Sequence, residues 1–450
     1  MTLPSAEIWG ELRSLLHRHD LEPRTRQDWL NITQSIAKLP EAEQYTAALY
    51  AEKFIHESNH IWPAHVCSFS VNPRNRKLPP HFAAMLIKKL ELTQLTELHT
   101  NFYEELLTLP KLSIAHLNLE AHRVKLSTLR TLLQATSLSH LTHLEFTSLS
   151  SHNKDTQHIL CALLGSAFQT SLQDLTVKHL EQDALQSLAL VLNQSPTIST
   201  LTLHEGVYPR DAWQSLFAQM THNLESLTLS AVTNISDAID LMIQTQHIDE
   251  LQKLHMGVLN EDGLVLLSKA NNHTLHDLKL SADALTEHSI SALEGALFFD
   301  RLKHLQLTRS HTGPAHRYMN RLRESGLLTQ LHTLNLSDTP LLEDGLHATL
   351  CEPLPSLRTL NLAHTGAGEH TLHHVMTCEM PRLERLNISG ATLDSADIPR
   401  LGQHARARWP ALKELILTLP HTHERDMHME LSEWLPEHVK LTSHPKEIGP

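Results

Sequence analysis

The sequence predicts an α/β fold in which short parallel strands alternate with helices and the repeated units stack into a curved solenoid. Leucine accounts for 86 of the 450 residues, about 19%, whereas aromatic residues account for 4%. A six-residue frame, apolar-x-x-apolar-x-apolar, recurs at a mean spacing of about 27 residues. Helical patterns fill the sequence between the frames. Because one strand and one helix cannot enclose a core, we expect neighbouring units to stack on one another.

The frame occurs fourteen times, which is far more than chance placement of leucines would give. Its last three residues alternate apolar and polar, so each copy predicts a short strand with one buried face. The copies begin at Val66, Leu95, Ile114, Leu141, Leu172, Ile198, Leu224, Leu251, Leu275, Leu302, Leu331, Leu357, Leu383 and Leu412. The sequence therefore predicts about fourteen parallel strands.

The segments between the frames have helical periodicity. In DALQSLALVL, Leu185, Leu188 and Leu192 fall at i, i+3 and i+7 on one helix face. In TEHSISALEGAL the same spacing ends at Leu297, and Thr286 is placed to cap the helix. A helix is wider than a strand, so we expect the strands on the concave side and the helices on the convex side.

The two ends of the chain differ from the repeats. Residues 1–60 contain three amphipathic helical patterns, and we interpret them as a helical cap that covers the first repeat. Residues 61–441 form the predicted solenoid, in which Val439 and Leu441 belong to a last short strand. Residues 442–450 are predicted to be a frayed tail.

This repeat resembles that of leucine-rich repeat proteins, over roughly residues 61–441. The length near 27 residues is similar to the ribonuclease-inhibitor-like and F-box-associated subclasses, and SDTPLLEDGLHATL places Gly345 where their helix begins. The family usually has Asn or Cys eight residues after the first leucine of the frame, and no copy here has Asn. The residues that could partly replace it are Asp283, Ser310, Thr339 and Thr365. The resemblance implies a non-catalytic scaffold that binds proteins.

Composition argues against several classes of function. The net charge of −13 and the pI near 6.3 disfavour binding to duplex nucleic acid or to an anionic membrane surface. The sequence has no apolar run of 18 residues and no secretory signal at its start. We expect a cytosol-like compartment and a chain that is monomeric on its own.

The four cysteines do not form a disulfide framework, and no CxxC pair is present. Cys161, Cys351 and Cys378 each lie 20 or 21 residues after the start of a frame, so we expect them to be buried structural residues; Cys67 lies within the first frame. The sequence has no GxGxxG, P-loop, GxSxG or HExxH motif, so we predict neither an enzyme nor a cofactor.

The candidate binding surface is the concave face of the predicted strands, because the polar frame positions point there. Its N-terminal part carries acidic residues and histidines, its C-terminal part is mostly uncharged, and it has no aromatic anchor. The candidate partner-binding residues are Glu97, His99, His116, Glu120, His143, Glu145, Asp174, Lys178, His204, Lys253, His255, Lys279, His304, Asn335, Asn361, Arg385 and Asn387. We predict that a protein partner binds there.

The 36 histidines raise the question of a metal site. His99, His116 and His143 share the predicted face with Glu120 and Glu145, and imidazole and carboxylate together can bind zinc. However, residues on a curved strand face diverge, and neither this group nor HTHERDMH has the spacing of a known site. We therefore favour a surface on which histidine replaces other polar residues. Exposed histidines would make the affinity for a charged partner change between pH 7.5 and 5.5.

Two further clusters have alternative interpretations. Tyr208, Trp213 and Phe217 indicate either a packed helix, which we favour, or an exposed interface. A basic run indicates either a solvated helix face, which we favour, or a patch for an acidic partner. This run consists of Arg301, Lys303, Arg309, Arg317, Arg321 and Arg323, with Tyr318 among them.

The sequence thus predicts a non-catalytic protein-binding scaffold, with two alternatives. Residues 1–60 resemble an F-box through Leu12, Leu15 and Leu16 and through Trp29, which would make the chain a substrate adaptor of a ubiquitin ligase. The isoleucine position of that motif is occupied by Glu11, however. The second alternative is a bacterial effector that is delivered into a host cell and binds a host protein.

Overall fold

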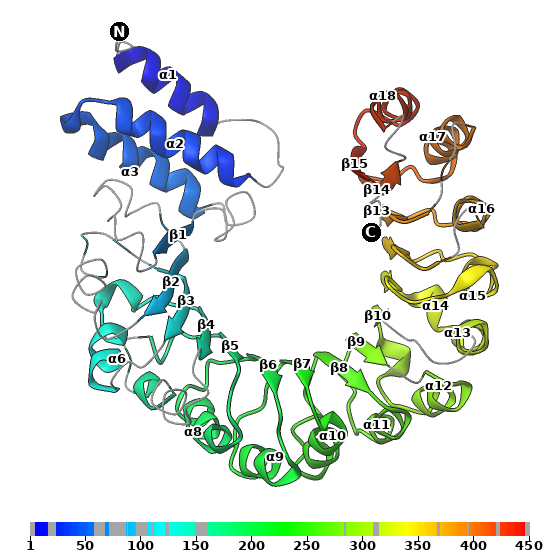
Figure 1. Ribbon diagram of the computed structural model, residues 1–450, viewed down its shortest axis with the longest axis horizontal. Coiled ribbons are helices and arrows are strands. Elements are labelled where there is room, and N and C mark those ends of the chain that lie inside the picture. The colour runs from blue at the N-terminus through cyan, green and yellow to red at the C-terminus, as the bar shows by residue number, and fades with distance from the viewer. Residues whose placement is uncertain are drawn as a thin grey trace. The chain divides into compact units, whose positions relative to one another are not determined.

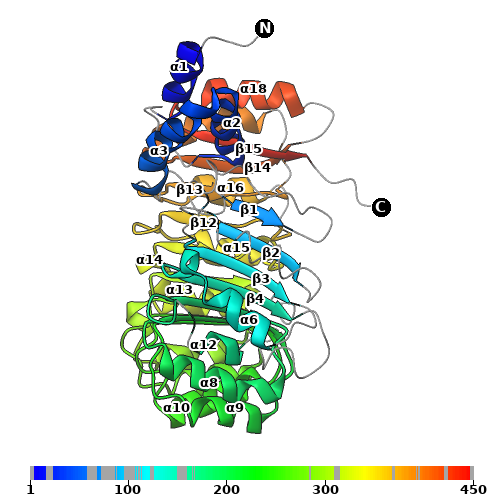
Figure 2. The same cartoon turned by 90° about the vertical axis from the view of Figure 1, so that its left-hand side faces the viewer.

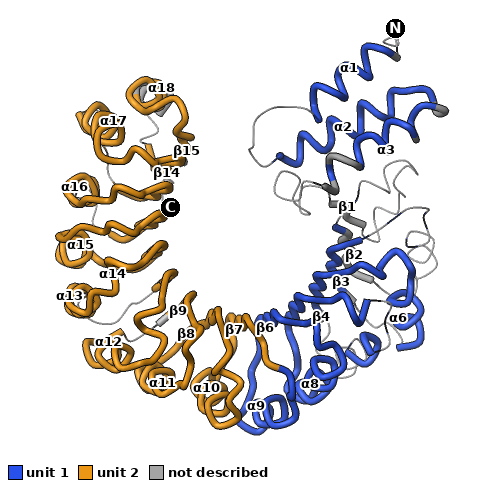
Figure 3. The backbone as a smooth tube through the Cα atoms, turned by 180° about the vertical axis from the view of Figure 1, so that it is seen from behind, with its two compact units in different colours: residues 1–222 blue, residues 223–450 orange. Residues whose placement is uncertain are grey.

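The computed structural model (Figure 1) shows repeated strand–helix units. It describes residues 5–16, 24–57, 68–71, 87, 89–95, 107, 109, 112, 114–121, 126–148, 160–164, 166, 168–282, 285–308, 315–366, 370–391, 393, 396–419 and 424–445. The chain divides into two compact units, unit 1 (residues 1–222) and unit 2 (residues 223–450), which Figure 3 distinguishes by colour. Each unit is described by itself.

Unit 1 begins with three helices and continues with strand–helix repeats. Its elements are α1 (Ser5–Leu16), α2 (Arg26–Lys38), α3 (Glu41–Glu57), β1 (Ser68–Val71), β2 (Lys89–Leu95), β3 (His116–Ala121), α6 (Leu126–Leu133), η2 (Thr136–Leu138), β4 (His143–Ser148), β5 (Asp174–Lys178), η3 (Gln182–Ala184), α8 (Leu185–Gln194), β6 (Thr200–Gly206) and α9 (Arg210–Phe217). Strands β1 to β6 pair in parallel and in chain order, and Figure 2 shows β1 to β4 side by side.

The three N-terminal helices pack on one another, as their amphipathic patterns predict. Leu12 and Ile32 are fully buried. Thr25 begins α2 with a capping box: its hydroxyl accepts the Asp28 N–H while the Asp28 carboxylate accepts the Thr25 N–H. The role of these helices as a cap stays a prediction.

Unit 2 consists of repeats throughout. Its elements are β7 (Ser226–Val232), α10 (Ile235–Gln244), β8 (Lys253–Leu259), α11 (Glu261–Leu267), β9 (Asp277–Ala282), α12 (Glu287–Glu294), η4 (Phe299–Arg301), β10 (His304–Thr308), α13 (Ala315–Glu324), α14 (Leu327–Gln330), β11 (Thr333–Asn335), α15 (Leu342–Leu350), β12 (Thr359–Asn361), α16 (His370–Thr377), β13 (Arg385–Asn387), α17 (Asp397–Arg408), β14 (Glu414–Leu419), α18 (Glu424–Trp434) and β15 (Lys440–Pro445). Strands β7 to β15 pair in parallel and in chain order. Within the unit, the helices lie along one side of these strands (Figure 3).

The core of each repeat is formed by the apolar residues of the frame. In unit 2, Leu227, Leu254 and Leu278 are paired directly across β7, β8 and β9 and are at most 2% exposed. In unit 1, Leu144 and Leu175 are paired in the same way and are buried. A leucine on one strand therefore covers the leucine on the next, which is the stacking that the frame predicts. The fold is a leucine-rich repeat solenoid.

A left-handed backbone position follows many of the strands, seven residues after the start of the frame. The residues with this conformation are His179, Glu205, Ala231, Asp338, His364 and Gly390. At Gly390, whose φ is +84°, a Cβ atom would lie 2.8 Å from Nδ1 of His364. Glycine is therefore the residue that fits this left-handed position without strain.

The threonines predicted to replace the family asparagine make backbone hydrogen bonds. Thr339 is fully buried, and its hydroxyl donates to the carbonyl of Leu307 in the preceding repeat at 2.9 Å. The hydroxyl of Thr365 donates to the carbonyl of Leu362 at 3.1 Å. Asp283 and Ser310 lie outside the described residues.

The structure corrects the second frame. The prediction began it at Leu95, whereas strand β2 pairs Lys89 with His116. The frame therefore begins at Ile87, which is fully buried, and reads IKKLEL. The segment from Leu95 departs from the apolar pattern at Thr100, its sixth position, whereas IKKLEL satisfies the pattern, and pairing with β1 and β3 establishes the register.

The predicted helices are present at both quoted segments, with one correction. Leu185 and Leu188 in α8 are fully buried, and Thr286 caps α12. However, α12 ends at Glu294, so Leu297 lies beyond the helix and is 49% exposed instead of continuing the buried face. At the C-terminus the predicted boundary between residues 441 and 442 falls within β15.

In the parts of the chain that the structure describes, none of the helices has the length and apolar character needed to span a membrane.

Candidate functional site

The candidate site is the strand face, which we define as the frame positions that alternate with the buried leucines on β2 to β14. On β5 the exposure alternates as expected, with Leu175 and Val177 buried and the residues on either side of them partly exposed. Of the predicted partner-binding residues, Glu97 and His99 lie outside the described residues. The positions that β2 places beside His116 and Asn118 are instead Lys89 and Glu91.

In unit 1 the strand face brings three predicted residues together. The imidazole rings of His116 and His143 stack with centroids 3.9 Å apart and planes inclined by 8°. Nε2 of His143 is hydrogen-bonded to the Asp174 carboxylate, and its Nδ1 lies 2.7 Å from the hydroxyl of Thr142. Partial burial favours a raised pKa of Asp174, but hydrogen bonds from His143 and Thr200 outweigh it and hold that pKa below its usual value. Both ring nitrogens of His143 are thus engaged within the protein.

A second pair lies beside this cluster. Nζ of Lys178 is 2.5 Å from Oε1 of Glu145. Glu120 and His204 occupy the same face on β3 and β6, in the row that also contains Lys178. The charges of Glu145, Lys178 and Asp174 are therefore largely compensated within unit 1.

In unit 2 the strand face has a similar pair and a row of imidazoles. Nε2 of His255 is 3.2 Å from Oδ1 of Asp277, and Nδ1 of His304 is 3.0 Å from the hydroxyl of Thr333. Burial and the neighbouring positive groups lower the pKa of His304. Lys253 and Lys279 extend from the same two strands as His255 and Asp277, and Lys253 is exposed.

Three of the predicted partner-binding residues are hydrogen-bonded to the backbone of their own turns. The side-chain oxygens of Asn335, Asn361 and Asn387 each accept the backbone N–H of the second residue that follows, at 3.0 Å. This Asx-type bond turns the chain out of the strand. These amides therefore stabilise the turns. Arg385, on β13, is exposed.

The other sequence clusters resolve as follows. Tyr208, Trp213 and Phe217 are at most 2% exposed, so they form the packed helix that we favoured. Cys378 is buried, and burial raises its pKa to about 12. Cys351 is exposed, contrary to prediction, because α15 ends at the preceding residue. Cys161 is partly exposed.

The residues of the basic run lie partly on the helices of unit 2 and partly at the edge of its strands. Arg321 pairs with Glu294, and Arg323 lies 3.5 Å from Glu352, so these helix residues are compensated. Arg301 and Lys303 lie instead at the edge where strand β10 begins. Arg309 lies outside the described residues.

The sequence prediction missed one row of side chains at the N-terminal edge of the strands in unit 2. The basic edge row is His276, Lys303, His332 and Arg358, each at the second position of its frame. Their backbones form a ladder, because the N–H of each of the last three donates to the carbonyl of the one before it, at 2.8–2.9 Å. The rings of His276 and His332 lie 6.4 and 6.2 Å from that of His304. The signal was the second letter in LHDLKL, LKHLQL, LHTLNL and LRTLNL, which the alternation of the strand face does not include.

No protein-family model and no curated protein sequence matches the chain. Among solved structures, it is similar to a chain in the crystal structure of the Rad7 and Elc1 complex in yeast. That similarity has 13% identity and a TM-score of 0.41 and covers 92% of this chain and 90% of the other. It is also similar to a chain in the TLR13–ssRNA13 complex, with 14% identity and a TM-score of 0.30 over 80% of this chain and 59% of the other. At such identities the likeness concerns the fold alone.

Proposed function

We propose that this protein is a non-catalytic scaffold that binds a protein partner through its strand face. The support is that the apolar and the polar residues of each repeat have separate roles. The apolar residues of the frame are used for stacking, and the helices lie on the other side of the strands. The polar residues between them therefore form a surface that the core does not require.

The chemistry of that face favours protein recognition over catalysis. Its charged side chains form pairs such as Lys178–Glu145 and His255–Asp277 at 2.5 and 3.2 Å. Pairs of this kind hold their side chains in place, so the face presents a fixed pattern of charge to a partner. In the described part of the chain, no group of three or more His, Cys, Asp or Glu side chains is arranged to hold a metal ion.

The test is quantitative capture of partners by the full-length protein and by variants of each face. In unit 1, exchanging a pair as Glu145→Lys with Lys178→Glu keeps the ion pair and the net charge but inverts the pattern. In unit 2, Lys253→Glu with Lys279→Glu reverses two charges on the strand face. We expect at least one of these variants to lose a partner that the wild-type protein retains.

The matched control lies on the helix layer. Arg317 in α13 and Arg400 in α17 are exposed, and changing both to Glu alters the net charge as much as the unit 2 variant does. This control should retain the partner. Partners that survive both strand-face variants and disappear with Arg317→Glu and Arg400→Glu would place binding on the helices and overturn the proposal.

The ligase-adaptor alternative stays a prediction. Leu12 and Leu16, which carry its motif, are buried within the N-terminal helices, where they already contribute to packing. Capture of a ligase adaptor subunit by the full-length chain, abolished by Leu15→Glu on the partly exposed side of α1, would support it. Delivery into a host cell likewise stays a prediction.

A further inference from the structure

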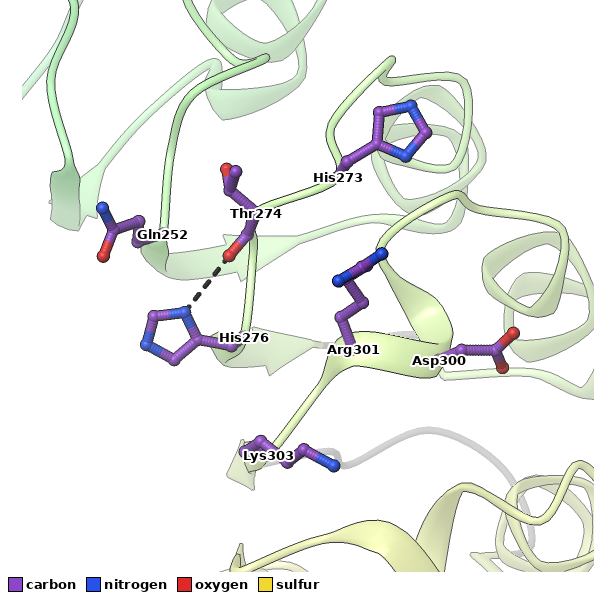
Figure 4. Close-up of a pocket in the computed structure, with 7 residues that line it drawn as sticks. All are labelled: Gln252, His273, Thr274, His276, Asp300, Arg301 and Lys303. Carbon is purple, nitrogen blue, oxygen red and sulfur yellow. Dashed lines mark hydrogen bonds between the residues drawn. The ribbon is translucent and has the colours of Figure 1, made fainter.

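A pocket of about 700 Å³ opens at the N-terminal edge of strands β8 to β10 in unit 2. It is lined by Gln252, His273, Thr274, His276, Asp300, Arg301 and Lys303, which Figure 4 shows as sticks. We call it the edge pocket. Four of these seven residues carry basic or titratable nitrogen groups and one, Asp300, carries a carboxylate, although the chain as a whole is acidic.

The walls of the edge pocket are fixed by buried groups. Asn272 is fully buried; its amide donates to the carbonyls of Ile248 and Leu251, at 2.5 and 2.8 Å, and its oxygen accepts the backbone N–H of Thr274 and of Leu275. These bonds tie the loop that carries His273 to the preceding repeat. A binding site pre-organised in this way loses less conformational entropy on binding.

The opposite wall is held equally firmly. Arg301 ends the short turn η4, whose Phe299 is 4% exposed. The carbonyl of Phe299 accepts a hydrogen bond from the side chain of Gln330 at 3.2 Å. The guanidinium group of Arg301 therefore projects from an anchored turn.

The positive charge at the edge pocket is uncompensated within the described structure. Neither Arg301 nor Lys303 forms an ion pair there, and Figure 4 shows the Asp300 carboxylate pointing away from both. Nδ1 of His276 lies 3.1 Å from the carbonyl of Thr274 and so donates to it, which leaves Nε2 of the ring available.

The surplus continues along the basic edge row and then ends. His332 follows Lys303, and slight burial together with Lys303, Arg358 and Arg382 lowers the pKa of its ring. Beyond it, the Glu384 carboxylate lies 3.4 Å from Arg358 and 2.7 Å from Lys413 and compensates part of their positive charge. The uncompensated stretch therefore spans three neighbouring strands.

We propose that the edge pocket and the adjoining basic edge row bind an acidic segment, rich in Asp or Glu, of the partner protein. The argument is charge complementarity: Arg301 and Lys303 carry fixed positive charges, and the imidazoles of His276 and His332 flank Lys303 on the neighbouring strands. Such a row, with strands about 4.8 Å apart, suits several carboxylates along an extended chain better than one isolated phosphate. This inference names the chemistry of the partner and so rests on the proposed function.

Nucleic acid fits this edge less well. Proteins that bind single strands place aromatic side chains beneath successive bases. Among the described residues, the exposed large apolar side chains include no aromatic one.

The experiment measures fluorescence anisotropy of a labelled poly-glutamate peptide of about ten residues with the full-length protein at low ionic strength. We expect binding that weakens as salt is added. Arg301→Glu with Lys303→Glu should lower the affinity by about tenfold or more, because two attractions become repulsions. The neutral pair Arg301→Gln with Lys303→Gln should lower it less.

The control is again Arg317→Glu with Arg400→Glu, which changes the net charge by the same amount and should bind the peptide as the wild-type protein does. Equal affinities of the two reversed variants would overturn the proposal, as would tighter binding of a labelled RNA oligonucleotide of equal charge. A partner lost with strand-face variants while the peptide fails to bind would overturn only this inference and leave the proposed function standing.

Discussion

Units 1 and 2 have the same backbone ladder at the N-terminal edge of their strands but different side chains on it. In unit 1 the described second frame positions are Ala115, Thr142, Gln173 and Ser199, all uncharged, and the N–H of each of the last three donates to the carbonyl of the one before it at 2.9 Å. In unit 2 the corresponding hydrogen bonds join the basic edge row at 2.8–2.9 Å. The ladder uses only backbone atoms, so the side chains at this position are free to differ.

Charges are also distributed differently over the two units. In unit 1 they are paired on the strand face, as in His143–Asp174 and Lys178–Glu145. In unit 2, Arg301 and Lys303 remain without an acidic partner in the described structure. Paired charges fix side chains in place, whereas unpaired charges are available to a ligand. The paired residues of unit 1 therefore organise the surface, whereas Arg301 and Lys303 are available to contribute binding energy.

The largest expected effect tests whether the two units share one type of core. Leu175→Ala in unit 1 and Leu278→Ala in unit 2 each remove a fully buried side chain. Each should lower the free energy of unfolding by about 3 kcal/mol in urea denaturation. Leu190→Ala, at a position 46% exposed, is the control and should change it by less than about 0.5 kcal/mol. A loss confined to one unit would contradict the common stacking.

The next effect concerns pH and belongs to unit 2 alone. Burial and the adjacent positive groups lower the pKa of His304 and of His332 below 6.5, so both rings are mainly neutral at pH 7.5. Bound carboxylates favour the protonated rings, so protons are taken up on binding and affinity rises as the pH falls. We expect the affinity for the acidic peptide to increase several-fold between pH ~7.5 and ~5.5, where its carboxylates stay ionised.

The groups that face these rings are His276, Lys303, Arg358 and Arg382, with Asp277 and Lys253 beside His304. Replacing both His304 and His332 with Gln removes these two rings, and the remaining pH dependence should be shallower. An affinity that is flat or that falls over this range in the wild-type protein would contradict the prediction.

A smaller effect tests the pairing in unit 1. Asp174→Asn removes the carboxylate that His143 contacts, and we expect a loss of at most about 1 kcal/mol near pH 7 because the pair is partly exposed. The pKa of Asp174 is lowered by folding, so this stabilisation is present above about pH 3.8 and is lost as the pH falls through the depressed pKa. Urea denaturation near pH 7 and at a pH below the depressed pKa of Asp174 measures this stabilisation. Asp300→Asn in unit 2 should show no such difference, and an equal loss at both pH values would refute the assignment.

The smallest effect tests the freedom of the second frame position. Gln173→Lys in unit 1 and Lys303→Gln in unit 2 exchange the side chains of equivalent rungs and leave the backbone ladder intact. Each should change the free energy of unfolding by less than about 0.5 kcal/mol. Lys303→Gln should nevertheless weaken binding of the acidic peptide, so stability and affinity separate at this position. A loss of stability above about 1 kcal/mol in either variant would mean that the side chain supports the ladder.

Much of the fold was predictable because its signal is local. A strand with one buried face needs only alternation, and a helix that packs against it needs apolar residues at i, i+3 and i+7, so Leu185 and Leu278 could both be placed from the sequence. The errors came from judging single segments. The frame predicted at Leu95 has polar Thr100 at its sixth position, whereas the segment from Ile87 is a complete frame. Leu297 continues a helical spacing although its helix ends after Glu294.

The candidate site was less predictable. The strand face could be identified by alternation, but the functions of its residues could not. Asn335 was identified as a candidate for partner binding, but the sequence did not show that its side-chain oxygen accepts a backbone N–H of its own turn. Arg301 and Lys303 were grouped with helix residues close in sequence, although the repeat places them beside His276, 25 or more residues away.

The sequence by itself determined the repeating unit, the buried side of each strand and the apolar core, because these follow from the spacing of side chains along a single strand or helix. Only the tertiary structure decided which polar side chains meet, such as His143 with Asp174 or His255 with Asp277. Those contacts join residues of different repeats, and their distances depend on strand register and on the length of each connecting segment. The spacing within one repeat does not specify either quantity.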